Sequence, residues 1–217
     1  MYLILFIIVL IILIFCFSHF KYIYSIHKRR NVHSNKRRKI LIELYNIIID
    51  AAEATNTKPF LIYGTLLGFV RNKDLICYDY DLDFGIENVQ FSIISKYLNN
   101  YIKNFPEYQL VNKIILGYNN IEIIHTNTTL SADISGFSIK NNMYSRDVPK
   151  LYSKYYLKEK FVEYPKEWIV PLQGIHFLNR NTYIPNIPKN LLNCYYGKNF
   201  IIPDHTCNFD CSICKKI

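Results

Sequence analysis

The segment Tyr78–Asp83, with the sequence YDYDLD, constrains the fold most because it places three carboxylates at alternate positions. Side chains alternate along a strand, so in an extended segment Asp79, Asp81 and Asp83 would point to one face. Like charges that lie a few ångströms apart repel, and a folded chain gathers them only with a cation or a proton. The neighbouring residues that are apolar, as in a half-buried strand, are Ile76, Leu82, Phe84 and Ile86. The pattern predicts a strand from about Cys77 to Ile86 with a hard-metal site at the edge of a core.

The formal net charge of +9 belongs to one short region of the 217-residue chain. Eight of the 26 Lys and Arg residues lie between residues 21 and 39, with no acid among them. From residue 40 onward, the other 18 basic residues face all 17 acidic ones, so this part is only +1. A basic surface for nucleic acid would be spread over the folded domain. The charge distribution therefore excludes nucleic acid from the expected partners.

Residues 1–20 contain no charged residue, and Leu3–Phe17 is an almost continuous run of Ile, Leu, Val and Phe. This length suits a single transmembrane helix, so we expect an uncleaved anchor in the lipid bilayer. A cleaved signal peptide is the alternative, but this segment lacks the basic start and small-residue cleavage site of such peptides. Residues 21–38 are expected to form a basic stalk near lipid head groups, with a targeting signal as the alternative.

The orientation of this anchor has two conflicting indications. The basic cluster follows the apolar segment, and the positive-inside rule would then keep the rest of the chain in the cytoplasm. The sequon Asn127-Thr128-Thr129 would be usable only if the domain were lumenal.

The chain from residue 39 to 205 reads as one α+β domain with a mixed β-sheet and packed helices. Apolar spacing predicts helices over residues 39–55, 91–105 and 191–196, and a short helical turn over 66–71. Strand-like runs cover residues 60–63, 110–118, 121–126 and 130–139, and shorter ones cover 168–170, 175–178 and 183–184. Helices and strands do not alternate regularly, which argues against a doubly wound fold.

Two features of this domain point to chemistry. Gly64-Thr65 follows a short strand and opens a helical turn, where glycine lets the backbone approach a ligand and N–H groups can hold a phosphate. An ordinary strand-to-helix turn is the alternative. Asp81 and Asp83 suit Mg²⁺ or Mn²⁺, which take few protein ligands and leave room for substrate phosphates. We expect Asp79 to support this pair, and a solvated strand face is the alternative for all three.

Asp133 and Arg71 are further candidates. Asp133 lies in a strand of small or apolar residues, and it would complete the metal site or act as base toward an acceptor hydroxyl if that strand adjoins the acidic one. Otherwise it is an acid at a strand end. Arg71 lies between the glycine turn and the acids, where it would pair with a phosphate or with Asp74 on the surface.

At these residues the sequence resembles the LicD/fukutin family. Tyr63–Arg71 (YGTLLGFVR) and Ile76–Asp83 (ICYDYDLD) are similar to its Gly-Thr-Leu-Leu-Gly turn with a following Arg and its Ile-Pro-Trp-Asp-Asp-Asp-Ile-Asp segment. The likeness continues through Val170-Pro171-Leu172, Ile184-Pro185 and Tyr195-Tyr196-Gly197, so that it covers roughly residues 40–205. Two positions depart from the pattern: Cys77-Tyr78 replaces Pro-Trp, and Tyr80 replaces the middle Asp.

The resemblance implies a nucleotidyltransferase-like fold that transfers a phospho-alcohol, such as phosphocholine or ribitol phosphate, from a CDP-alcohol donor to a glycan or glycoprotein hydroxyl. It implies that Asp81 and Asp83 hold the divalent metal, that Asp133 supplies a third carboxylate, and that Gly64 and Thr65 contact the donor phosphates. Fukutin-like members are anchored by one N-terminal helix in the Golgi, so it also implies an ER or Golgi membrane with a lumenal domain. An Asp-x-Asp glycosyltransferase and an inactive, membrane-bound binding module are the alternatives.

Residues 206–217 form a cysteine-rich tail that contains Cys207, Cys211 and Cys214. Their C-x3-C-x2-C spacing occurs in radical SAM enzymes, but only three residues follow Cys214, which leaves no room for the barrel of such an enzyme. A disulfide of this tail in an oxidising lumen is expected, and Cys194 is one candidate partner. A zinc site completed by His205 and unpaired thiols are the alternatives.

Overall fold

The computed structural model describes residues 32–112, 119–146 and 163–203, together with Phe6, Ile7, Leu10, Leu13 and Cys16. The expected anchor (residues 1–20) falls outside these ranges except for those five positions, and the cysteine-rich tail (206–217) falls outside them entirely. Within the described part of the chain, no helix combines the length and apolar character needed to cross a membrane.

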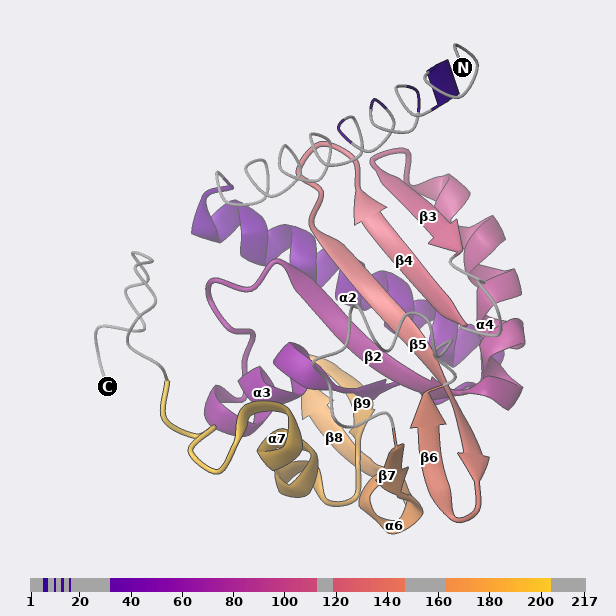
Figure 1. Ribbon diagram of the computed structural model, residues 1–217. Coiled ribbons are helices and arrows are strands. Elements are labelled where there is room, and N and C mark those ends of the chain that lie inside the picture. The colour runs from indigo at the N-terminus through magenta and orange to yellow at the C-terminus, as the bar shows by residue number, and fades with distance from the viewer. Residues whose placement is uncertain are drawn as a thin grey trace.

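The described strands form one mixed sheet in the order β3-β4-β5-β2-β1-β9-β8, with β6 paired to β5 and β7 paired to β6 (Figure 1). The pairs β2–β5 and β1–β9 are parallel, and the other pairs are antiparallel. The bounds are β1 (Phe60–Leu61), β2 (Asp81–Glu87), β3 (Tyr108–Asn112), β4 (Asn120–His125), β5 (Ser131–Lys140), β6 (Met143–Arg146), β7 (Glu163–Pro165), β8 (Gln173–Phe177) and β9 (Arg180–Ile184).

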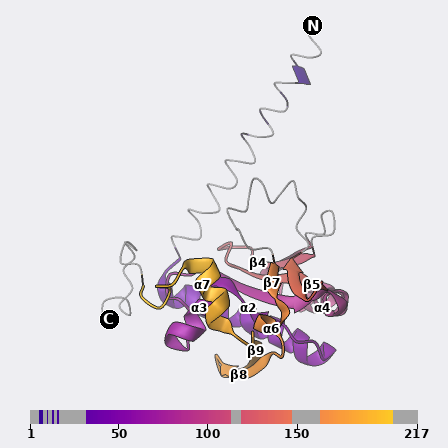
Figure 2. The same cartoon turned by 60° about the horizontal axis from the view of Figure 1, so that its bottom comes forward.

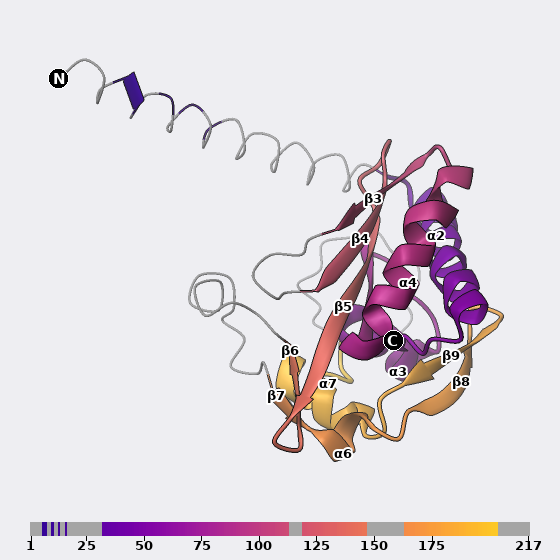
Figure 3. The same cartoon turned by 90° about the vertical axis from the view of Figure 1, so that its right-hand side faces the viewer.

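The helices are α2 (Ser34–Thr55), α3 (Tyr63–Asn72), α4 (Asn88–Tyr101), the 3-10 turn η1 (Ile102–Asn104), α6 (Lys166–Ile169) and α7 (Pro188–Tyr196). Figure 3 shows α2 and α4 side by side on one face of the sheet. Alternate residues of β2 explain this arrangement, because Leu82, Phe84 and Ile86 are buried in the core that also holds the apolar side of α2. The acidic residues of β2 consequently point to the opposite face.

That opposite face carries a second, smaller core around Phe60, Phe137 and Tyr144, to which Tyr164 of β7 and Leu191 of α7 contribute. Helix α7 packs against α3 and α6 on this side (Figure 2). The face is therefore covered only in part, and the smaller core adjoins the region that contains the aspartates.

The expected α+β class with one mixed sheet is confirmed, and several boundaries differ from the prediction. Helix α2 begins at Ser34, so the last residues of the expected stalk belong to it. The helical turn predicted at 66–71 is the longer helix α3, and the strand predicted at 168–170 is instead the end of the short helix α6.

The acidic strand begins at Asp81, four residues later than predicted. Residues 76–80 form a turn instead, in which the Asp79 N–H donates to the Ile76 carbonyl at 3.0 Å. Arg37 of α2 stabilises the turn: its Nη1 donates to the Cys77 carbonyl at 3.3 Å, and its guanidinium carbon lies 4.8 Å from the centre of the Tyr80 ring. The expectation that all three acids lie on one strand was therefore wrong for Asp79.

Candidate active site

Asp81, Asp83 and Asp133 lie on neighbouring parallel strands. In the register between β2 and β5, Asp83 is paired with Asp133, and Asp81 is paired with Ser131. Because the strands are parallel, the first residues of both lie at the same edge of the sheet. The sequence predicted a role for Asp133 only if its strand adjoins the acidic strand. The structure meets this condition.

The N-terminus of α3 lies directly against these acids. The Ile62 N–H donates to the Asp83 carbonyl at 3.1 Å, and the Asp83 N–H donates to the Thr65 hydroxyl at 2.8 Å. A Cβ atom on Gly64 would lie 2.8 Å from Oδ2 of Asp79 and 3.8 Å from Oδ2 of Asp83. Glycine therefore lets the Asp79 carboxylate approach the start of the helix more closely than a residue with a Cβ atom would.

Asp79 belongs to the same cluster although it lies outside the strand. Burial raises the pKa of its carboxyl to about 8, and the Asp81 carboxylate adds to the shift through repulsion and a hydrogen bond. Burial also raises the pKa of Asp83 well above its usual value, followed by repulsion from Asp81, Asp133 and Asp79. The cluster therefore retains a proton near neutral pH when no cation is bound.

The donor atoms of this cluster are hard carboxylate oxygens, which suit Mg²⁺ or Mn²⁺. Within the described residues, no three or more His, Cys, Asp or Glu side chains are arranged to hold a metal ion. Asp133 instead accepts a hydrogen bond from Nδ2 of Asn120 at 3.0 Å. A pair of carboxylates is sufficient for Mg²⁺ when substrate phosphates complete its shell. Asp81 and Asp83 fit that arrangement, and the third ligand stays a prediction.

Thr65 and Arg71 differ in their relation to this site. Thr65 is only 2% exposed, and its hydroxyl already accepts from Asp83, so it positions the backbone of the acidic strand. Arg71 lies in the last turn of α3, where Nε donates to the Phe200 carbonyl at 2.6 Å and Nη2 donates to the Ile202 carbonyl at 3.3 Å. The structure does not bring Arg71 to the carboxylates, and Asp74 pairs with Arg38 instead.

Arg146 is a site residue that the sequence did not single out. Its register partner across the β5–β6 hairpin is Phe137, two alternations from Asp133, so Arg146 lies on the acidic face of the sheet. Nη1 of Arg146 donates to the Tyr63 hydroxyl at 3.2 Å, and its positive charge opposes the rise in the pKa of Asp83. No pattern near residue 146 indicates this position, because the hairpin register alone determines it.

Tyr196 was missed as well. Partial burial raises the pKa of its hydroxyl although the residue is 45% exposed, and repulsion from Asp83 and Asp79 contributes next, so the hydroxyl lies within electrostatic range of these carboxylates. The neighbouring Tyr195 ring packs on Tyr63, with 4.5 Å between ring centres. Helix α7 therefore brings Tyr195 and Tyr196 toward the start of α3 and the acids, and the family-like segment Tyr195-Tyr196-Gly197 was the sequence signal for them.

Glu122 extends the acidic row onto a third strand. It is paired with Asp133 across β4 and β5 and is only 9% exposed. The alternation Ile121-Glu122-Ile123 is the same kind of signal that identified Asp133 and would have found it.

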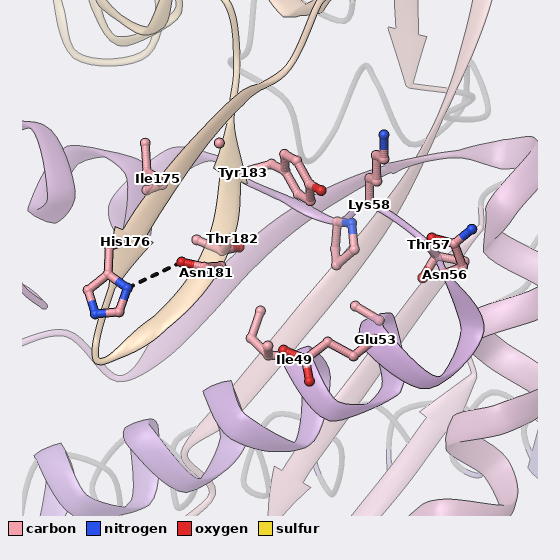
Figure 4. Close-up of a pocket in the computed structure, with 13 residues that line it drawn as sticks. Ile49, Glu53, Asn56, Thr57, Lys58, Ile175, His176, Asn181, Thr182 and Tyr183 are labelled. Carbon is pink, nitrogen blue, oxygen red and sulfur yellow. Dashed lines mark hydrogen bonds between the residues drawn. The ribbon is translucent and has the colours of Figure 1, made fainter.

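A pocket of about 760 Å³ lies away from this site, between the end of α2 and the β8–β9 hairpin (Figure 4). Glu53, Lys58, His176 and Tyr183 are among its lining residues, and Nδ1 of His176 lies 3.3 Å from Oδ1 of Asn181. It shares no residue with the carboxylate cluster, its Glu53 pairs with Arg180 at 2.9 Å, and His176 meets an amide oxygen, so we assign it no catalytic role.

A mixed sheet that presents aspartates from two parallel strands beside a glycine-opened helix defines a nucleotidyltransferase-type domain. The model of the LicD/FKTN/FKRP nucleotidyltransferase domain matches residues 56–187, which is more than half of the chain. The chain belongs to this family, and it is thereby a domain of the transferase type.

The solved structures that match the chain are distant. The solution structure of the antibiotic-resistance factor ANT(2'')-Ia is 10% identical with a TM-score of 0.43, and the match covers 75% of this chain and 74% of that one. The crystal structure of ANT(2")-Ia with adenylyl-2"-tobramycin is 14% identical (TM-score 0.35, coverage 50% and 57%). Terminal uridylyl transferase 4 from Trypanosoma brucei with bound UPU is 13% identical (TM-score 0.32, coverage 46% and 35%). These similarities are too low to inform the substrate. No curated protein matches the sequence.

Proposed function

We propose that this protein is a membrane-anchored, metal-dependent phosphotransferase that moves a phospho-alcohol from a CDP-alcohol to a hydroxyl of a glycan or glycoprotein. The main observation behind this proposal is that Asp81, Asp83 and Asp133 lie on adjacent strands beside Gly64, at the start of α3. The family membership supplies the class of reaction.

The residues have distinct roles in this proposal. Asp81 and Asp83 would hold a Mg²⁺ or Mn²⁺ ion, which would supply positive charge toward the donor diphosphate. The N–H groups at the start of α3, near Gly64, face the phosphates, and glycine keeps that approach open. Arg146 supplies positive charge near Asp83. Thr65 acts through the backbone of Asp83.

The transfer is a displacement at phosphorus. The acceptor hydroxyl oxygen attacks the phosphorus that carries the alcohol, and the bond from this phosphorus to the bridging oxygen breaks, so CMP leaves with that oxygen. Asp133, held by Asn120, takes the proton of the attacking hydroxyl. The acidic row would repel a diphosphate in the absence of a cation, which is why the proposal includes metal dependence.

The anchor and the compartment are part of the proposal. The apolar residues 1–20 anchor the chain in the bilayer as a single-pass protein, and the basic residues that follow lie near the head groups. The domain faces the lumen of the ER or Golgi, where glycan acceptors are available. Asn127 of the sequon is exposed in the turn after β4, which supports this orientation.

The test is release of CMP. The full-length protein in detergent is incubated with CDP-choline, CDP-ribitol or CDP-glycerol, a glycan acceptor and Mn²⁺, and CMP is measured. We expect turnover with one donor, and we expect Asp81→Ala and Asp83→Ala each to abolish it while both variants remain folded and unfold in one cooperative transition. Asp74→Ala is the matched control, because this aspartate pairs with Arg38 outside the site. Full activity in both site variants would refute the assignment.

The same preparation distinguishes the alternatives. Turnover of a sugar nucleotide in place of a CDP-alcohol would support the glycosyltransferase. Absence of both turnover and Mn²⁺ binding, measured by calorimetry, would support the inactive binding module.

A further inference from the structure

Cys77 forms a disulfide, although it precedes Asp79 by only two residues. The chain has six cysteines, and of the three that the structure describes, Cys16 and Cys194 are free thiols. The suggestion that Cys194 takes part in the tail disulfide was therefore wrong. We propose that Cys77 pairs with a cysteine of the C-terminal segment 207–214 and that this bond fixes the turn that carries Asp79.

The described end of the chain approaches Cys77. Arg71 binds the carbonyl groups of Phe200 and Ile202, so this part of the chain lies beside the last turn of α3, as Figure 1 shows. Cys77 follows Arg71 by six residues in sequence. Three residues separate Pro203 from Cys207, so the chain between them spans up to about 14 Å, and the later cysteines can reach further. The described chain end and the turn that carries Cys77 both lie against the second half of α3, the one at Arg71 and the other at Gly68.

The turn at residues 76–80 is held by noncovalent contacts to α2, to α3 and to β5. Arg37 contacts the Cys77 carbonyl and the Tyr80 ring, and the turn lies against α3, where a Cβ on Gly68 would meet the Ile76 nitrogen at 3.1 Å. The position of this turn matters for the site, because the turn holds the Asp79 carboxylate next to Gly64 and Asp81. A covalent bond at Cys77 therefore restrains the segment of the site that lies outside the sheet.

The bond would form by thiol–disulfide exchange with a disulfide such as oxidised glutathione. One cysteine thiolate attacks that disulfide and releases one glutathione thiolate, and the second cysteine then displaces the other. Two cysteine thiols lose two electrons and two protons in total, and one glutathione disulfide becomes two thiols. Such a bond persists in an oxidising compartment, which agrees with a lumenal domain.

Tryptic mapping tests the pairing, because cleavage isolates each relevant cysteine. Residues 74–96 contain only Cys77, residues 190–198 contain only Cys194, and residues 199–215 contain the three tail cysteines. The full-length protein is equilibrated with oxidised glutathione, alkylated and digested without reduction. We expect peptide 74–96 linked to peptide 199–215, with Cys194 alkylated. Alkylated Cys77, or a link from Cys77 to any other peptide, would overturn the proposal. Single Ser variants of the tail cysteines then identify the partner.

A second measurement tests the effect on the turn. Reduction with dithiothreitol should lower the melting temperature of the wild type by roughly 5 to 15 °C. It should also increase deuterium uptake in residues 74–80. Cys77→Ser should show the reduced behaviour with or without dithiothreitol, and Cys194→Ser should behave as the wild type. Equal melting and equal uptake before and after reduction would contradict the role assigned to the bond. Both measurements are independent of transferase activity.

Discussion

Gly64→Ala should separate catalysis from folding. A Cβ atom at this position would lie 2.8 Å from Oδ2 of Asp79, whereas ordinary contact begins near 3.4 Å. The carboxylate oxygen must therefore move by about 0.6 Å. It belongs to a side chain end, not to the backbone, so the displacement falls on the site and leaves the sheet in place.

The expected change in stability is small. Moving the Asp79 side chain away from its preferred rotamer costs about 0.5–1.5 kcal/mol. Replacing glycine by alanine within a helix stabilises the folded state by up to about 1 kcal/mol. The net change in the free energy of unfolding is within about 1 kcal/mol, or about 4 °C in melting temperature. A misplacement of about 1 Å at a reacting centre costs about 100-fold in rate, so a loss of about 10- to 100-fold is expected here.

The assay measures CMP release and thermal melting of the same preparations. Gly174→Ala is the matched control, since a Cβ there meets no atom within 4 Å, and it should change neither quantity. Gly85→Ala provides the contrast, because its Cβ would lie 2.6 Å from the buried Phe60 ring and should destabilise the fold by about 1–3 kcal/mol. Wild-type activity in Gly64→Ala, or unfolding of this variant, would refute the geometry inferred for the site.

Two further predictions concern charge and compartment. The folded pKa of Asp79 is raised to about 8 from an ordinary 3.8, so the folded state binds the extra proton and metal-free protein loses stability as pH rises between about 4 and 8. The slope is at most about 1.4 kcal/mol per pH unit for this group, and urea titrations in EDTA should show a shallower slope for Asp81→Asn. Asn127, exposed after β4, should carry a glycan removable by peptide-N-glycosidase when the full chain is made in eukaryotic cells. Asn127→Gln is the control, and an unmodified Asn127 in the wild type would favour the cytoplasmic orientation.

The sequence predicted the central part of the site because local alternation determines it. Asp81 and Asp83 share a face of β2, and Asp133 stands out as an acid in an otherwise small or apolar strand. Neither of these sequence patterns shows that the two strands adjoin each other. The parallel register of Asp83 with Asp133 depends on the intervening segments, including β4, which returns antiparallel along β5. The resemblance to a family supplied this link before the structure did.

The sequence could not place the residues whose position depends on long-range packing. Arg71 has the spacing of a site residue, but helix α3 carries it about 12 Å along its axis from Tyr63, to the carbonyl groups near the chain end. Arg146 has no local signal, and it reaches the site only because β6 folds back on β5. Both cases concern an arginine whose partners lie more than 80 residues away in the sequence.

Arg37 explains how the chain accommodates one departure from the family pattern, the tyrosine at position 80 in place of the middle aspartate. The guanidinium carbon of the buried Arg37 lies 4.8 Å from the centre of the Tyr80 ring. Its bond to the Cys77 carbonyl is a backbone contact that does not depend on the side chain at position 77. Tyr80 also packs against the main core, so its side chain does not compete for the carboxylate face. A carboxylate at position 80 would have paired with Arg37, whereas the aromatic ring satisfies the same cation without adding another acid to the site.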